Sequence, residues 1–200
     1  MTRVLLALVL SLALLVPAGS ALAVAPQDFP AQAPENHLVD GADVLSRATN
    51  GELSKRLERL EQDHINANLV TLRRLDYGVD LDGFASDLLQ RWHAGDDGSL
   101  LLVVETATNS AAIKADAGVQ QRLPESLLES TAEETMALPL RDGDRYRQAV
   151  VDGLTRLETV LAGGEDPGPP LVAETQVLVS NVPTKEETAE SKAWVWITVL

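Results

Sequence analysis

The chain has 200 residues, 45% of them hydrophobic, and a formal net charge of −14. This length favours one modest domain with additional segments. The negative charge argues against nucleic-acid partners, whose phosphates the protein would repel. The sequence has no cysteine, so disulfides, thiol catalysis and zinc–thiolate sites are excluded. Its three histidines, His37, His64 and His93, are scattered and match no metal-ligand spacing.

Residues 1–25 have the pattern of a secretory signal peptide. Arg3 supplies the basic start, residues 4–16 form the apolar core, and residues 21–23 and 23–25 (Ala-Leu-Ala and Ala-Val-Ala) offer small-x-small cleavage sites. The alternative is an uncleaved anchor, against which the short apolar core argues. We therefore expect an exported protein, which in a bacterium is located in the periplasm or, in a photosynthetic one, in the thylakoid lumen.

Residues 26–35 are rich in proline and alanine and predict an extended leader. The folded domain is expected over residues 36–163. Its first helix is predicted to begin at Thr49, which forms a capping box with Glu52, and to end near Asp63. Leucines that recur at spacings of four and three give this helix one apolar face.

A strand is predicted over residues 68–75, and a second helix is predicted over residues 83–93. Asp80 or Asp82 can cap that helix, because a carboxylate oxygen accepts hydrogen bonds from the first free amides. Trp92 falls on the apolar face of the helix. This position predicts a core side chain and not a platform for a ligand.

The stretch from residue 92 to residue 104 organises the rest of the prediction. Gly95 can end the helix, residues 96–98 (Asp-Asp-Gly) form an acidic turn, and residues 99–105 have the pattern of a strand buried on both faces. A short polar loop leads to a further strand at residues 111–117, and loops of this length join antiparallel neighbours. We expect this acidic turn to be the best candidate for a catalytic or ligand-binding site.

The rest of the domain is predicted to be helical. Pro124 suits the first position of a helix, Pro139 is expected to end that helix, residues 141–144 form a second acidic turn, and the last helix spans residues 146–162. Strands thus alternate with helices, apart from one hairpin. The predicted fold class is α/β, a three-layer α/β/α sandwich with a mixed, mostly parallel sheet of about four strands. Ligand sites in such sheets lie outside the carboxyl ends of the strands. Neither a GxGxxG nor a GK[S/T] motif supports nucleotide binding.

The end of the chain changes in character. Residues 164–192 combine prolines with acidic and small residues and predict a flexible linker. Residues 193–200 (AWVWITVL) are abruptly apolar, with two tryptophans, which favour membrane interfaces. Eight residues rise only about 12 Å as a helix, against the ~20 residues that a bilayer needs. We expect the start of a truncated C-terminal membrane anchor, and the alternative is an apolar tail with another contact.

Four segments carry a resemblance to a known family. They are HLVDGADVLS (37–46), WHAGDDGSLLLVV (92–104), IKADAGVQQRLP (113–124) and PLRDGDRYRQAVVDG (139–153). In this order they resemble motifs of the TPM domain family, and more narrowly of its cyanobacterial and chloroplast photosystem II repair proteins. The likeness covers residues 36–161. A secretory leader, this domain, a linker and a terminal anchor also form the layout of the cyanobacterial members.

The resemblance implies a role in photosystem II repair and assembly, and a plant relative has been described as an acid phosphatase and as binding calcium. Calcium takes six to eight oxygen ligands, largely carboxylates and carbonyls. Two acidic turns and a strand end can supply such oxygens, while no stretch matches an EF-hand loop. The candidate metal ligands are Asp40, Asp96, Asp97, Asp116, Asp142 and Asp144. The alternative is that these are separate turn and cap residues. The sequence departs from the family by having Asp97 in place of Asn and Asp116 in place of a Gly.

Three functions are therefore hypotheses. The first is a lumenal assembly or repair factor without enzymatic activity, which is tethered to the thylakoid membrane by its tail and binds photosystem II subunits or assembly intermediates. The second is a metal-dependent acid phosphatase, in which calcium held by aspartates activates water or an aspartate attacks phosphorus directly. The third is a generic periplasmic interaction module. No nucleophile–base constellation is recognisable in the sequence, so no catalytic residue is assigned.

Overall fold

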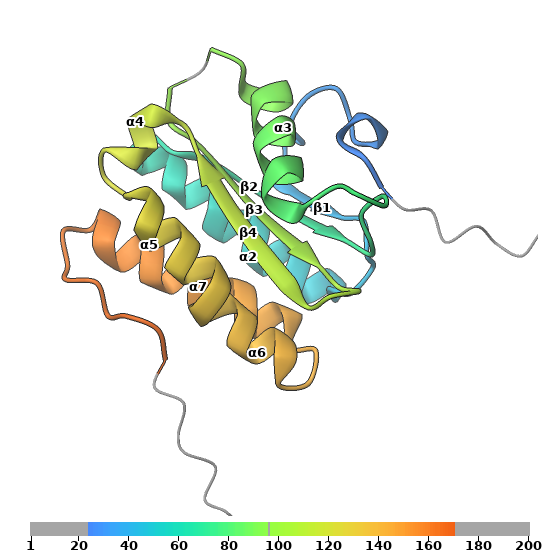
Figure 1. Ribbon diagram of the computed structural model, residues 1–200. Helices are drawn as coiled ribbons and strands as arrows, with labels where there is room; N and C mark the ends of the chain where they lie inside the picture. The colour runs from blue at the N-terminus through green and yellow to red at the C-terminus, as the bar shows by residue number, and fades with distance from the viewer. Residues whose placement is uncertain (1–23, 96, 171–200) are drawn as a thin grey trace, which may run out of the picture. The chain divides into compact units, whose positions relative to one another are not determined.

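The computed structural model describes residues 24–95 and 97–170, which include a four-stranded sheet of order β1-β2-β3-β4 (Figure 1). Its strands are β1 (Leu38–Asp40), β2 (Asn66–Leu72), β3 (Ser99–Glu105) and β4 (Ser110–Ala115). The pairs β1–β2 and β2–β3 are parallel, and the β3–β4 hairpin is antiparallel. The predicted mixed, mostly parallel sheet of four strands is confirmed.

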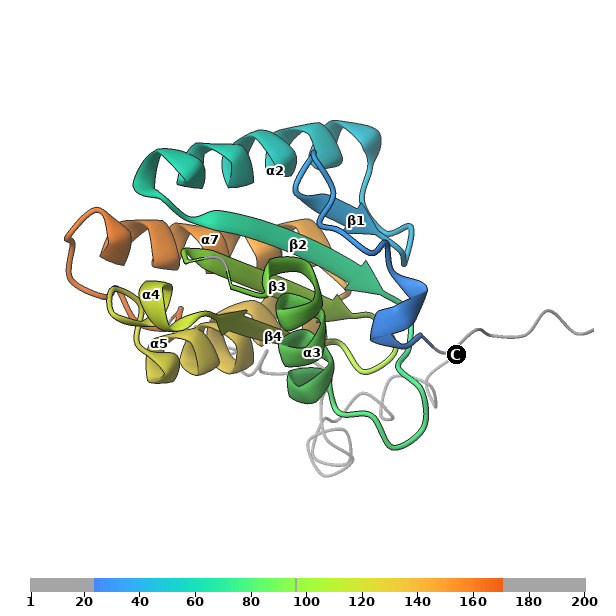
Figure 2. The same cartoon turned by 90° about the horizontal axis from the view of Figure 1, so that it is seen from above.

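Helices cover both faces of the sheet (Figure 2). Helix α2 (Arg47–Leu60) and helix α7 (Tyr146–Leu161) lie on one face, whereas helix α3 (Leu81–His93) lies on the other. The sheet is therefore the middle of three layers, and the predicted α/β/α sandwich is confirmed. Burial on both faces explains why every residue of β3 is buried.

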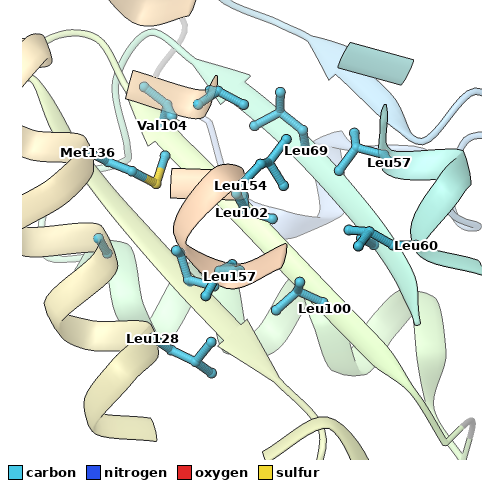
Figure 3. Close-up of a cluster of buried hydrophobic side chains, with 14 of the residues drawn as sticks. Leu57, Leu60, Leu69, Leu100, Leu102, Val104, Leu128, Met136, Leu154 and Leu157 are labelled. Atoms are coloured by element: carbon cyan, nitrogen blue, oxygen red, sulfur yellow. The ribbon is translucent and has the colours of Figure 1, made fainter. Parts of the chain in front are cut away.

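Alternate residues of β3 face opposite layers, because successive side chains of a strand point to opposite sides. Leu100, Leu102 and Val104 join the cluster under α2 and α7, which Figure 3 shows. Leu101 and Val103 join the smaller cluster under α3. The apolar run at the centre of the sequence thus serves both halves of the core.

Four short helical segments connect β4 to α7. They are α4 (Ala117–Gln120), α5 (Glu125–Ser130), the π-helical turn η3 (Thr131–Met136) and α6 (Ala137–Arg141). The prediction that Pro139 ends a helix is wrong, because Pro139 lies inside α6. A proline ring clashes with the carbonyl four residues earlier, and here that residue, Thr135, belongs to the wider π-helical turn. This turn gives the ring room without ending the helix.

Helix caps differ from the prediction at one helix and agree at another. Helix α2 begins at Arg47, two residues before Thr49, and its cap is Ser46, whose Oγ accepts a hydrogen bond from the Thr49 amide at 3.1 Å. Thr49 is instead the third helical residue, so its capping box with Glu52 is not used. Helix α3 is capped by Asp80, whose Oδ1 accepts from the Gly83 amide at 2.7 Å.

The segment expected to be an extended leader is part of the domain. A 3-10 turn, η1 (Pro26–Asp28), leads to Phe29, which is buried. The ring of Phe29 packs edge-on against Phe84 and Trp92, with centroid distances of 5.6 and 6.5 Å. Trp92 is a core residue, as predicted, and its Nε1 donates a hydrogen bond to the Pro30 carbonyl at 2.9 Å. Burial of the Phe29 ring therefore holds this segment against the domain, although its composition alone predicts an extended leader.

Two residues assigned to the signal peptide also contribute to the fold. The Val24 amide donates a hydrogen bond to the Arg74 carbonyl at 3.0 Å, and Val24 forms a parallel bridge with Leu75. Ala25 is buried. Cleavage after residue 23 would preserve these contacts, and cleavage after residue 25 would remove them.

The first part of the predicted linker is held against the domain. Asp166 forms two hydrogen bonds of 2.7 Å with the guanidinium of Arg156, a residue of α7. Among the described residues there is no helix with the length and apolar character of a membrane span. The predicted signal-peptide core, most of the linker and the predicted anchor at 193–200 lie outside the described residues.

Candidate functional site

The aspartates selected from the sequence lie at opposite ends of the sheet. Asp40 ends β1 at the carboxyl edge of the three parallel strands. Asp142 and Asp144 lie in the turn before α7, and Asp144 accepts a hydrogen bond from Asn109, in the loop that follows β3 at the same edge. Asp97 and Asp116 lie at the amino end of β3. Asp96 lies outside the described residues.

Asp40 organises the loop after β1. Its Oδ1 accepts from the Val44 amide at 3.2 Å, and its Oδ2 accepts from the Leu45 amide at 3.0 Å. The Thr71 hydroxyl, on the neighbouring strand, also donates to Oδ1. Both carboxylate oxygens therefore already have partners within the protein, as expected of a carboxylate that shapes a turn.

Asp116 caps the short helix α4 and ties it to β3. Its Oδ1 accepts from the Val119 amide at 2.9 Å, and its Oδ2 accepts from the Ser99 amide. Asp97 is exposed and is a close neighbour, because a Cβ built on Gly118 would lie 3.2 Å from Asp116 Oδ1 and 3.9 Å from Asp97 Cβ. Of the predicted ligands, the structure thus brings this pair together.

The second acidic turn is held by its own contacts. Asp142 pairs with Arg145 at 2.6 Å, and Asp144 accepts from Asn109 Nδ2 at 2.7 Å. Burial and the nearby Asp144 carboxylate raise the pKa of the Tyr146 hydroxyl above its usual value. Within the described ranges, no group of three or more His, Asp or Glu side chains is arranged to hold a metal ion.

The two neighbouring aspartates should respond differently to substitution. We expect Asp116→Asn to lower the free energy of unfolding by about 1 kcal/mol, because the amide cannot accept both backbone hydrogen bonds. Asp97→Asn should change it by less than about 0.5 kcal/mol, as is usual for an exposed side chain. Urea denaturation of both variants measures the difference. Equal effects would contradict the capping role of Asp116.

A cavity lies at the carboxyl edge of the sheet, at the opposite end from Asp97 and Gly98. It has a volume of about 910 Å³ and is formed where β1, β2 and β3 end, together with the segment around η1. Val39, Leu72 and Phe29 give it apolar walls, while Arg73 and Arg74 are exposed at its margin. This is the edge at which ligands bind in open α/β sheets.

Sequence reasoning states this edge rule, but the acidic turn that it favours for chemistry lies at the other end of the sheet. Of its candidate ligands, Asp40, Asp142 and Asp144 lie at this edge. Asp97 and Gly98 of that turn directly precede β3 and therefore lie at the amino end of that strand. Arg73 and Arg74 directly follow β2, and Thr106 directly follows β3. Listing the residues that follow each parallel strand would have found this cavity.

The loop after β2 presents apolar side chains to solvent at the same edge. Tyr77 is fully exposed, and Val79 is 39% exposed. The neighbouring Asp80 caps α3, and Leu75 is buried, so both ends of the loop are fixed to the domain. A solvent-facing aromatic ring on an anchored loop is a feature of interaction surfaces.

A second, more polar cavity of about 550 Å³ lies at the amino end of β3. It is lined by residues that include His93, Lys114 and Asp116, and His93 Nε2 lies 3.1 Å from Asn68 Nδ2. Burial alone would lower the pKa of Lys114, but its 2.8 Å contact with Asp82 and other nearby carboxylates raise that pKa above its usual value. The Lys114 ammonium therefore stays charged beside this cavity.

Known proteins with similar sequences include chloroplastic UPF0603 proteins of plants. One from Arabidopsis thaliana is 33% identical over 162 residues, which are 79% of this chain and 56% of the relative. One from Oryza sativa subsp. indica is 30% identical over 163 residues, with 79% and 54% covered. The chain thus spans about half the length of these curated relatives.

Two solved structures share the fold. The N-terminal domain of a protein from P. gingivalis has a TM-score of 0.63 at 23% identity, covering 71% of this chain and 94% of that one. The N-terminal domain of the cg2496 protein from Corynebacterium glutamicum has a TM-score of 0.51 at 15% identity, covering 74% and 90%. The family model described as the TPM domain matches residues 38–160, so this chain belongs to the TPM domain family.

Proposed function

We propose that this protein is an exported binding factor that associates with photosystem II subunits or assembly intermediates in the thylakoid lumen and protects them during repair of photodamage. The observation that carries the proposal is the fully exposed Tyr77 at the carboxyl edge of the sheet. Val79 adds apolar surface on the same loop, and Arg73 and Arg74 lie just before it. Tyrosine and arginine are among the side chains enriched at the energetic centres of protein interfaces.

The compartment in this proposal comes from two independent sources. The plant relatives are named chloroplastic. The sequence itself predicts a secretory leader and an apolar tail with two tryptophans. Together they support a lumenal protein tethered to the thylakoid membrane. A host without thylakoids would instead favour a periplasmic interaction module.

Affinity purification of the tagged full chain from solubilised thylakoids tests the proposal. We expect photosystem II intermediates to copurify, and Tyr77→Ser to reduce their yield at least about fivefold, the effect of losing about 1 kcal/mol at an interface. Lys55→Ser, an exposed change on α2, is the matched control and should leave the yield unchanged. The proposal is wrong if no intermediate copurifies and deletion of the protein leaves recovery from strong light unchanged.

A second candidate function is a calcium-dependent acid phosphatase. It is favoured by the proximity of the exposed Asp97 to Asp116 at the amino end of β3. A carboxylate there can hold a cation that activates water, or attack phosphorus directly. Hydrolysis of an aryl phosphate that requires calcium or magnesium, stops with chelator and is lost in Asp97→Asn would support it. Equal rates for the wild-type protein and the variant in every metal would reject it.

A further inference from the structure

We propose that the cavity at the carboxyl edge of the sheet binds an amphiphilic carboxylate, a small molecule with an aliphatic body and one anionic head. The aliphatic body would lie against the apolar walls, and the head would pair with Arg73 and Arg74. The volume of about 910 Å³ falls within the range of small-molecule sites, about 300–1,000 Å³. This proposal does not depend on association with photosystem II.

The walls of the cavity match an aliphatic ligand. Val24, Phe29, Val39, Leu72 and Ala107 come from four separate stretches of the chain and meet around the same space. Phe29 and Leu72 are buried side chains of the cluster under α3, so the inner wall is continuous with the core. An aliphatic chain in this space removes its own surface and that of the walls from water, which is favourable in proportion to the apolar area.

The main chain around the cavity leaves little for a peptide to bind. The amides of Gly41 and Ala42 donate to the Thr71 carbonyl and hydroxyl, at 2.9 and 3.3 Å. The amides of Thr106 and Ala107 donate to the carbonyls of residues 72 and 73, at 3.0 and 2.9 Å. An extended peptide needs a row of unpaired main-chain groups, whereas an aliphatic chain needs none. The occupant that fits is therefore a small molecule.

The charges at the margin favour an anionic head. Arg73 and Arg74 are exposed and form no ion pair with any carboxylate of the described residues. The one carboxylate of the lining belongs to Asp28, whose Oδ2 accepts a hydrogen bond from the Ala25 amide at 2.9 Å. A guanidinium pairs with a carboxylate through two parallel hydrogen bonds. Because the chain carries a net charge of −14, retention of an anion here depends on these two local cations.

Calorimetric titration of the purified full chain with laurate, below its micellar concentration, tests the proposal. We expect binding at one site and at least about tenfold weaker binding of dodecyltrimethylammonium, which has the same tail and the opposite charge. The double variant Arg73→Gln/Arg74→Gln should weaken laurate binding at least about tenfold. Ala107→Trp, which places an indole in the mouth of the cavity from an exposed position, should abolish it.

The controls separate this site from nonspecific adsorption. Arg91→Gln removes one exposed cation near the end of α3 and should leave laurate binding unchanged. Far-ultraviolet circular dichroism and thermal melting should be the same for the arginine variants and the wild-type protein, because all three arginines are exposed. The proposal is overturned if laurate does not bind, if it binds no better than the cationic analogue, or if the double variant and Ala107→Trp bind it as well as the wild-type protein.

Discussion

Gly98→Ala should be the most damaging single-methyl change in the domain, lowering the free energy of unfolding by about 3 kcal/mol. Gly98 has a φ of +96°, and a Cβ there would lie 2.3 Å from the carbonyl oxygen of His64. A left-handed conformation costs an L-residue roughly 1–2 kcal/mol, and a forced contact with packed atoms costs typically 1–3 kcal/mol. The Asn66 amide donates to the Gly98 carbonyl at 2.7 Å, so the backbone cannot easily move away.

Gly95→Ala is the matched control for this prediction. Gly95 has a similar φ of +90°, but no atom of the described residues lies within 4 Å of the position of a Cβ. The free energy of unfolding of this variant should fall by about 1 kcal/mol, because only the cost of the left-handed conformation applies. Thermal melting should place Gly98→Ala roughly 10 °C below the wild-type protein and Gly95→Ala about 3 °C below it. Similar melting temperatures for the two variants would show that His64 and Gly98 are not in contact.

Gly95 and Gly98 show which features near the first acidic turn can be predicted from the sequence. The sequence predicts that Gly95 ends a helix and that Gly98 belongs to a turn, and the structure gives both a positive φ. The sequence does not reveal that Gly98 lies against His64. These two residues precede β3 and β2, and the pairing of those strands brings them together. The conformation of a turn depends on residues that are neighbours in the sequence. The close approach of two loops depends on the register in which distant strands pair.

The fold class could be predicted because hydrophobic periodicity is a local signal. The continuous apolar run in β3 predicted burial on both faces, and all seven residues of the strand are buried. Element ends were less accurate. The strand predicted over residues 68–75 spans Asn66–Leu72, and the strand predicted over residues 111–117 ends at Ala115. It ends there because Asp116 caps the next helix.

The candidate ligands could not be ranked from sequence, because an aspartate that caps a helix and one that binds a cation have the same neighbours in the chain. Asp40 and Asp116 each accept two backbone hydrogen bonds, so their carboxylates are used by the fold. The cavity of Arg73 and Arg74 was missed for the opposite reason. Its lining comes from four stretches that are distant in the sequence, so no single local pattern marks it.

Asp166→Asn should lower the free energy of unfolding by about 2 kcal/mol at neutral pH. The Arg156 side chain is only 5% exposed, and its remaining partners are the hydroxyls of Ser130 and Thr135, both at 3.0 Å. Removing one member of a buried ion pair costs about 3–5 kcal/mol because the other charge stays uncompensated. Asp166 is 38% exposed, so solvent screening reduces this energetic cost. Asp142→Asn breaks a pair exposed on both sides and should cost less than about 0.5 kcal/mol.

The pH dependence of this loss identifies its cause. The hydrogen bond from Arg156 holds the pKa of the Asp166 carboxyl below its usual value of 3.8. The folded state therefore favours the ionised carboxyl. The contribution of Asp166 to the free energy of unfolding is complete above the pKa that this carboxyl has in the unfolded chain. It is lost as pH falls through the lower pKa of the folded state. Urea denaturation should show a constant gap between wild type and Asp166→Asn from about pH 5 to pH 8, closing below about pH 4 as the wild-type carboxyl becomes protonated. A gap that persists undiminished at the acid end would mean that the asparagine disturbs packing, and that the charge of Asp166 does not hold this segment to α7.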